Sequence, residues 1–285
     1  MTAPTIPAQE DTSTSVIHTS AAQFKNQTEF ISHVQNTIAK TTSFHELFYT
    51  QVPLAWGKAI VDYLNKNREG CGRKHYNSQN ELFWIRLMPL IIHDCVQFWC
   101  IVQARKWERA RLLTSNENDI LSIGVGTTFE FVGGPYSGSR KEPDCYILPE
   151  NLPLPRLVIE TGWSESHSRL RDDDMNTWLV GGNGHVQAVI LINWSKNTET
   201  NRVTGIAEIY ELDTDGMPVM RQSETIFPAP AQAPAVPPQF QVTRRTLFGP
   251  SIVDGADPNT LFPFSIDDLR NQATHSLARM NLLPA

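Results

Sequence analysis

Two acidic residues occupy positions at which a carboxylate could take part in chemistry. Asp144 lies near the start of the apolar segment Pro143-Asp-Cys-Tyr-Ile-Leu148, and Glu160 lies near the end of Leu157-Val-Ile-Glu-Thr161. Both segments are typical of strands, and the second is nearly all apolar, as expected of a strand buried on both faces. If the two strands are neighbours, the proline-rich connection between them brings both acids to one end of a sheet.

Oxygen ligands grouped in this way suit a hard divalent cation. The two carboxylates together with the backbone carbonyl of Thr161 predict a Mg²⁺ site, which Mn²⁺ could also occupy. A metal ion held there could polarise a phosphoryl oxygen and generate a hydroxide nucleophile. The predicted metal ligands are therefore Asp144, Glu160 and Thr161.

Each acid also has a structural interpretation. Asp144 follows a proline and could simply terminate a turn. Glu160 closes an apolar strand, where a carboxylate is costly unless it is paired or metal-bound, and a salt bridge to Arg169 or Arg171 would satisfy it. The run of acids at 172–174 favours a solvated helix face over a set of ligands.

Four segments in order resemble the PD-(D/E)xK restriction-endonuclease-like superfamily, and within it poorly characterised families of filamentous fungi related to Uma-type nuclease-like proteins. The segments are Glu142-Pro-Asp144, Leu157-Val-Ile-Glu160, Ser164-Glu-Ser166 and the strand that contains Val189-Ile-Leu-Ile192. The resemblance covers about residues 120–213, and more loosely Leu247-Phe-Gly249 and Ser265-Ile-Asp-Asp-Leu-Arg270. It implies a Mg²⁺-dependent nuclease whose metal is held by Asp144 and Glu160.

The sequence departs from the motif at its lysine. The superfamily places that lysine two residues after the second acid, where this chain has Gly162. The lysine orients the attacking water and stabilises developing negative charge. Arg169 or Arg171 could replace it in part, Lys141 could reach in from outside the motif, or the site does not cut, which is the interpretation we favour.

Hydrophobic periodicity predicts the α/β class: a restriction-endonuclease-like core of helix, three strands, helix and strand, with N-terminal helices and a C-terminal appendage. We expect helices around residues 30–38 and 53–65, a loop at 69–75, and a long apolar helical stretch at 79–113 that Pro89 splits or kinks. Strands are expected at 123–132, 143–148, 157–161, 186–194 and 205–213, with a helix from 164 to 180 between the third and fourth.

The same pattern predicts four parts of the chain. Residues 1–20 are expected to be disordered, and residues 21–225 to form the nuclease-like domain with its N-terminal helical elaboration. Residues 226–240, which include the run PAPAQAPAVPP, predict a Pro/Ala-rich linker. Residues 241–285 are too few for an independent domain and predict an appendage, with a helix capped by Ser265, that packs on the main fold.

Composition narrows the function classes. The 285 residues carry a formal charge of −6, which argues against broad electrostatic coating of nucleic acid or anionic membrane but leaves room for a local basic groove. The four cysteines show no CxxC spacing, and no signal peptide or membrane span is evident, so we expect an intracellular protein of the cytoplasm or nucleus with no membrane association.

Three functions remain open on these grounds. The first is a metal-dependent phosphodiesterase that acts on nucleic acid, with a positive groove built from Arg140, Lys141, Arg169 and Arg171. The second is a protein that keeps the fold for binding or regulation without turnover, and the third is an accessory protein-interaction module whose partner the sequence does not specify. Fold alone does not choose among them.

Overall fold

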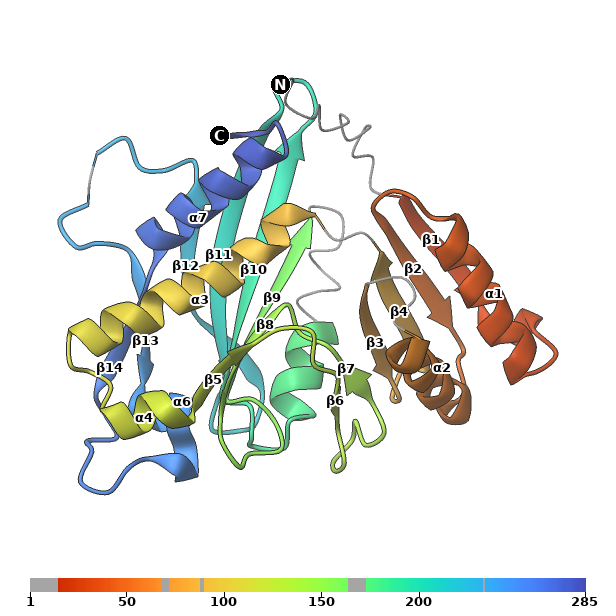
Figure 1. Cartoon of the computed structure of the whole chain (residues 1–285), viewed down its shortest axis with the longest axis horizontal. Coiled ribbons are helices and arrows are strands. Elements are labelled where there is room, and N and C mark those ends of the chain that lie inside the picture. The colour runs from red at the N-terminus through yellow and green to blue at the C-terminus, as the bar shows by residue number, and fades with distance from the viewer. Residues whose placement is uncertain (1–14, 68–71, 88–89, 164–172, 233) are drawn as a thin grey trace, which may run out of the picture.

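The computed structural model describes residues 15–67, 72–87, 90–163, 173–232 and 234–285. Within these residues, two large β-sheets lie side by side (Figure 1). Helices cover one face of the smaller sheet and both faces of the larger one. The chain is thus a mixed α/β protein, and the predicted class is confirmed. A separate pair of strands, β13 (Gln239–Thr243) and β14 (Leu261–Ser265), lies beside the larger sheet.

The larger sheet runs in the order β12-β11-β10-β9-β8-β5, and β15 adds to β11. Its strands are β5 (Leu121–Gly124), β8 (Cys145–Pro149), β9 (Leu157–Trp163), β10 (Ala188–Asn197), β11 (Arg202–Leu212), β12 (Pro218–Phe227) and β15 (Leu283–Pro284).

The smaller sheet runs in the order β1-β2-β4-β3-β7-β6. Its strands are β1 (Ser15–Ser20), β2 (His45–Thr50), β3 (Arg73–Asn77), β4 (Leu82–Leu87), β6 (Phe129–Glu130) and β7 (Arg140–Lys141).

The helices pack against the faces of the two sheets. In Figure 1, α1 and α2 lie against the smaller sheet, and α3 and α7 cross one face of the larger sheet. The α-helices are α1 (Gln27–Lys40), α2 (Leu54–Asn67), α3 (Ile91–Arg109), α4 (Ser115–Ile120), α6 (Arg244–Phe248) and α7 (Ile266–Arg279). Short 3-10 turns occur at Ala21–Gln23 and Gly249–Ser251, and the helical residues 173–180 end in a π-helical stretch, Asn176–Val180.

The first two predicted helices are confirmed as α1 and α2. In α1 the buried residues are Phe30, Val34 and Ile38, three and four positions apart as an amphipathic helix requires. The Asn26 side chain accepts a hydrogen bond from the Glu29 backbone N–H at 3.0 Å and so caps the helix.

The smaller sheet is the main correction to the sequence-based fold. Residues 15–20, predicted to be disordered, form β1 in parallel register with β2. Residues 73–75 begin β3 rather than a loop, and the predicted helical stretch from residue 79 begins instead with β4. The alternation in β4 explains this outcome, since Phe83, Ile85 and Leu87 join the core under α1 and α2 while the residues between them face the other sheet. The expected disorder of residues 1–14 lies outside the described residues.

The strands of the larger sheet follow the prediction more closely. All seven residues of β9 are buried, as its apolar run indicated. β8 is antiparallel to β9, whereas β10 is parallel to β9. The expected strand at 123–132 is shorter and is divided between β5 and β6, and β12 was not predicted.

The C-terminal residues contribute to the same hydrophobic core as α3. Trp99 and Trp107 of α3 donate their indole N–H groups to the carbonyl oxygens of Ser265 and Pro263, each at 2.8 Å. Ser265 caps α7 as expected, because its hydroxyl accepts a hydrogen bond from the Asp268 N–H at 3.3 Å. Residues 241–285 are therefore tied to the larger sheet through α3.

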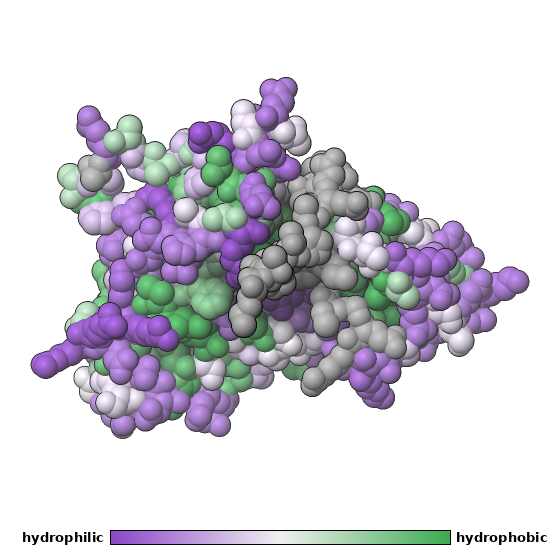
Figure 2. Space-filling view, turned by 45° about the horizontal axis from the view of Figure 1, so that its top comes forward, coloured by the Kyte–Doolittle hydropathy of each residue, from purple (hydrophilic) through white to green (hydrophobic). Residues whose placement is uncertain are grey.

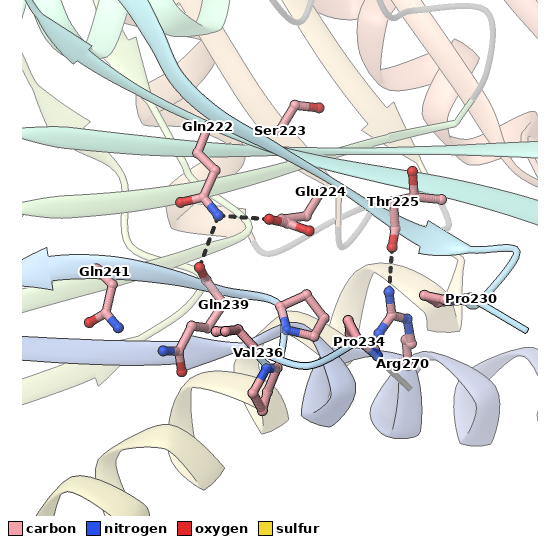
Figure 3. A pocket seen from close by; sticks show the side chains of 12 residues that line it. Gln222, Ser223, Glu224, Thr225, Pro230, Pro234, Val236, Gln239, Gln241 and Arg270 are labelled. Carbon is pink, nitrogen blue, oxygen red and sulfur yellow. Dashed lines mark hydrogen bonds between the residues drawn. The ribbon is translucent and has the colours of Figure 1, made fainter. Parts of the chain in front are cut away.

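The proline-rich segment between β12 and β13 lines an open groove of about 720 Å³ (Figure 3). Gln222 of β12 reaches the Gln239 carbonyl with its side-chain amide at 3.0 Å. At the other side, Arg270 of α7 donates to the Thr225 carbonyl at 2.6 Å. The strand before this segment and the strand after it are thus tied to the same part of the fold.

The surface differs between the two parts of the molecule. In the view of Figure 2, hydrophobic residues gather over the body at the left, whereas the outer end at the right is mostly hydrophilic. None of the helices within the described ranges is long and apolar enough to cross a membrane.

Gly124 is expected to be intolerant of a side chain. A Cβ at this position would lie 2.3 Å from the Tyr146 ring, so we expect Gly124→Ala to cost about 1–3 kcal/mol of unfolding free energy through overpacking. Gly133→Ala is the matched control, because its Cβ would meet nothing closer than the Asn183 side chain at 3.8 Å. Equal urea midpoints for the two variants would contradict this account of the β5–β8 contact.

Candidate functional site

The two acids expected to approach each other lie on neighbouring strands of the larger sheet. Asp144 immediately precedes β8, Glu160 lies within β9, and the pairing of Cys145 with Ile159 brings the backbones of the two acids close together. Both are buried, with 1% and 3% of their surface exposed. Buried carboxylates need partners, and each acid finds a different set.

Asp144 is surrounded by hydrogen-bond donors of this chain. Its Oδ2 accepts from the backbone N–H and the hydroxyl of Thr161, both at 2.8 Å. Arg73 donates to Oδ1 at 3.2 Å and Arg86 donates to Oδ2 at 3.3 Å. Burial alone would raise the pKa of Asp144, but the charges of Arg86 and Arg73 and the Thr161 N–H hold that pKa well below its ordinary value.

Thr161 links Asp144 to α3. Its hydroxyl donates to Asp144, so His93 of α3, whose Nδ1 contacts the same oxygen, must supply the hydrogen between them. Burial, followed by the charge of Arg86, lowers the pKa of His93 to about 3, so the ring is neutral. The backbone carbonyl of Thr161 was predicted to be a metal ligand; the N–H and hydroxyl of the same residue bond the neighbouring acid Asp144.

Glu160 points to a second environment. Its Oε1 accepts from the Trp178 indole N–H at 2.7 Å and lies 3.4 Å from Nζ of Lys141. Lys141 also forms an ion pair with Asp174. Burial, reinforced by the charges of Asp174 and Asp144, raises the pKa of Glu160 to about 8 although Lys141 opposes the shift.

Lys141 and Asp174 complete this second environment. Burial lowers the pKa of Lys141, but the charges of Asp174 and Glu160 outweigh it and raise that pKa overall. Burial raises the pKa of Asp174. Lys141 therefore stays protonated at neutral pH, while one proton remains on the two carboxyl groups of Glu160 and Asp174.

The smaller sheet supplies the positive charges and the region around β8 and β9 supplies most of the negative ones. Arg73 and Lys74 come from β3, Arg86 from β4 and Lys141 from β7. Arg73 and Lys74 also pair with Glu142 at 3.0 and 2.7 Å, and Arg86 pairs with Glu46 at 3.2 Å.

We call this set the inter-sheet charge cluster. Among the described residues its members are Glu46, Arg73, Lys74, Arg86, Lys141, Glu142, Asp144, Glu160 and Asp174. Four cations face five carboxylates, so a single proton on the Glu160–Asp174 pair makes the cluster neutral. The raised pKa values of both acids agree with that proton.

The described residues do not fit the predicted Mg²⁺ site. Over the ranges that the structure covers, no group of three or more His, Cys, Asp or Glu side chains is arranged to hold a metal ion. Both carboxylate oxygens of Asp144 already accept hydrogen bonds from guanidinium groups and from Thr161. Mg²⁺ requires several oxygen ligands at about 2.0–2.1 Å in octahedral geometry, which these oxygens cannot offer while the arginines are in place.

The other predicted site residues have separate outcomes. Arg169, Arg171 and the segment Ser164-Glu-Ser166 lie outside the described residues. Arg140, proposed as part of a positive groove, instead pairs with Asp62 at 2.5 Å and with Glu130 at 2.9 Å.

Lys141 does reach Glu160 from outside the motif, as one of the sequence-based alternatives proposed. The expectation of a solvated Asp174 is wrong, because its side chain is buried against Lys141. The sequence reasoning missed Arg73, Arg86 and the contact of Trp178. The only local signal was Arg86, a charge within the alternating strand Leu82–Leu87.

Comparisons of this chain with protein-family models, with curated proteins and with solved structures each find no match. What the site can do must therefore be inferred from its own residues.

Removal of the Asp144 charge is expected to destabilise the fold. Asp144→Asn keeps the shape of the side chain but leaves Arg73 and Arg86 without their shared carboxylate, which costs about 3–5 kcal/mol for a buried pair. Chemical unfolding measures the loss, with the exposed Asp119→Asn, expected within about 0.5 kcal/mol of wild type, as the control. A loss of less than about 1 kcal/mol would place these pairs with weak surface salt bridges.

Glu160 is expected to make the stability fall as the pH rises. Its pKa is raised in the folded state to about 8, so its contribution is complete below the unfolded pKa and is lost as the pH rises through the folded pKa. Between about pH 6.5 and pH 8 the wild type should lose up to about 1.4 kcal/mol per pH unit from this group. Below that window the lowered pKa values of His75 and His93 add the opposite trend.

The measurement is the unfolding free energy across that window for wild type, Glu160→Gln and the exposed control Glu150→Gln. Glu160→Gln should flatten the slope and the control should keep it. Identical slopes for all three proteins would show that Glu160 does not carry the proton.

Proposed function

We propose that this chain has a nuclease-like core of the PD-(D/E)xK type that serves a binding or regulatory role and does not hydrolyse phosphodiesters. Support for the core comes from the chain order α3, β5, β8, β9, helical residues 173–180 and β10. That order follows the helix, three strands, helix and strand implied by the sequence resemblance, although α4 lies between α3 and β5, and β6 and β7 join the smaller sheet. β8 is antiparallel to β5 and β9, and β9 is parallel to β10.

One observation carries the absence of hydrolysis. Both carboxylate oxygens of Asp144 are occupied by donors of this chain, namely Arg73, Arg86 and Thr161. A metal-dependent nuclease needs the corresponding acid to hold the ion that activates water. An acid engaged by two guanidinium groups serves instead as their counter-ion.

The cations of the inter-sheet charge cluster also offer little to a nucleic acid. Arg73, Lys74, Arg86 and Lys141 each pair with a carboxylate, so none of them presents uncompensated charge to a phosphate. The pairing of these four cations therefore favours a role other than strand cleavage.

A second candidate function is Mg²⁺-dependent cleavage of nucleic acid, and one contact favours it. Lys141 lies 3.4 Å from Oε1 of Glu160, so a lysine stands beside the second acid although Gly162 occupies the motif position. Because its pKa is raised, Lys141 would stabilise negative charge rather than act as a base. This function requires Asp144 to be released by both arginines.

The deciding experiment combines metal binding with cleavage. Calorimetric titration of wild type with Mg²⁺ and with Mn²⁺ should give no binding heat, and single- and double-stranded DNA and RNA should remain uncut. Asp144→Asn and Glu160→Gln, checked for folding by circular dichroism, serve as matched controls. Cleavage by wild type that both variants abolish would reject the proposal in favour of the second candidate.

A further inference from the structure

A divalent cation was expected between Asp144 and Glu160, yet two guanidinium groups engage Asp144 there. Arg86 is the more deeply buried of the two, with 1% of its side chain exposed, and Arg73 is 15% exposed. Both reach Asp144 across the boundary between the sheets, from β4 and β3.

The two arginines match a divalent cation in charge. Together they carry two positive charges, which is the charge of one Mg²⁺ ion. Arg86 acts on both acids, since Asp144 first and then Glu46 and Glu160 raise its pKa against the effect of burial. Arg73 lies close enough to bond Asp144 through its carboxylate and, at 3.4 Å, through its main-chain carbonyl.

The arginines are themselves held in place by partners of their own. Glu142 accepts from Arg73 at 3.0 Å, and Glu46 accepts from Arg86 at 3.2 Å. Arg86 also lies over the Trp84 ring, 4.9 Å from its centroid. These contacts hold the two guanidinium groups in place. The position of each group beside Asp144 therefore does not depend on a single bond.

We propose that Arg73 and Arg86 take the electrostatic place of a divalent cation, so that Asp144 fastens the smaller sheet to the larger one instead of holding a metal. The inference rests on the nuclease-like core proposed above and explains why such a core would contain no metal site. It assigns the two arginines a task that a metal ion and its waters would otherwise perform, namely compensation of the buried acids.

The consequence is that a divalent cation should stabilise the protein only when the arginines are removed. The variant Arg73→Gln/Arg86→Gln lacks two positive charges at the acids and should melt at a lower temperature than wild type. Mg²⁺ at about 10 mM should raise the melting temperature of this variant by about 3 °C or more and leave wild type unchanged. NaCl at the same ionic strength as the Mg²⁺ sample is the control for screening of the charges.

Two further variants make the test specific. Adding Asp144→Asn to the double variant should abolish the Mg²⁺ effect, because the acid that receives the ion is gone. Arg140→Gln removes an arginine that pairs with Asp62 and Glu130 away from the acids, and should show no Mg²⁺ effect. A shift that persists with Asp144→Asn, or that also appears in Arg140→Gln, would overturn the inference.

If the double variant does not fold, the single variant Arg73→Gln replaces it. Electron paramagnetic resonance of Mn²⁺ is then the readout, because bound Mn²⁺ loses the six-line spectrum of the free ion. Arg73→Gln is expected to reduce that spectrum. Wild type and Arg73→Gln/Asp144→Asn are expected to leave it unchanged. Equal Mn²⁺ spectra for wild type and Arg73→Gln would overturn the inference. Since none of these readouts measures cleavage, the inference and the proposed function can fail separately.

Discussion

The contact of Asp144 with Arg73 and Arg86 is the interaction on which the arrangement of the two sheets depends. The carboxylate belongs to the larger sheet and both guanidinium groups belong to the smaller one. All three groups are largely withdrawn from water, where separated charges would be very costly. The sheets must therefore approach each other closely enough for the charges to meet, and Lys141 repeats the arrangement with Glu160 and Asp174.

The alternation of a strand accounts for the opposite behaviour of the two acids. Glu160 and Thr161 are adjacent in β9 and so point to opposite faces of the sheet. Thr161 meets Asp144 and the neutral His93 of α3, whereas Glu160 meets Trp178 on the helical residues 173–180. Asp144 receives two arginines and is easily ionised, while Glu160 shares one lysine with Asp174 and holds a proton. Two acids on neighbouring strands, whose side chains have different partners, thus have pKa values displaced in opposite directions.

Local patterns predicted the elements that depend on local sequence. The spacing of Phe30, Val34 and Ile38 identified α1, and the apolar run at Leu157 identified β9. The smaller sheet escaped prediction because β3 and β4 are short and their outer neighbours, β7 and β2, are distant in sequence. The partners of Asp144 escaped for the same reason, since Arg86 and Arg73 precede it by 58 and 71 positions. Lys141 could be considered from the sequence because it lies close to Asp144 in the chain, but its contact with Asp174 depends on the fold.

The excursion of the chain through β6 and β7 has a consequence for how the chain can be divided. The chain leaves the larger sheet after Gly124, adds β6 and β7 to the smaller sheet beside β3, and returns at Cys145. The last strand of the smaller sheet thus follows the first strand of the larger one. No single cut in the backbone leaves both sheets whole, so neither sheet can be removed as one continuous terminal piece of the chain.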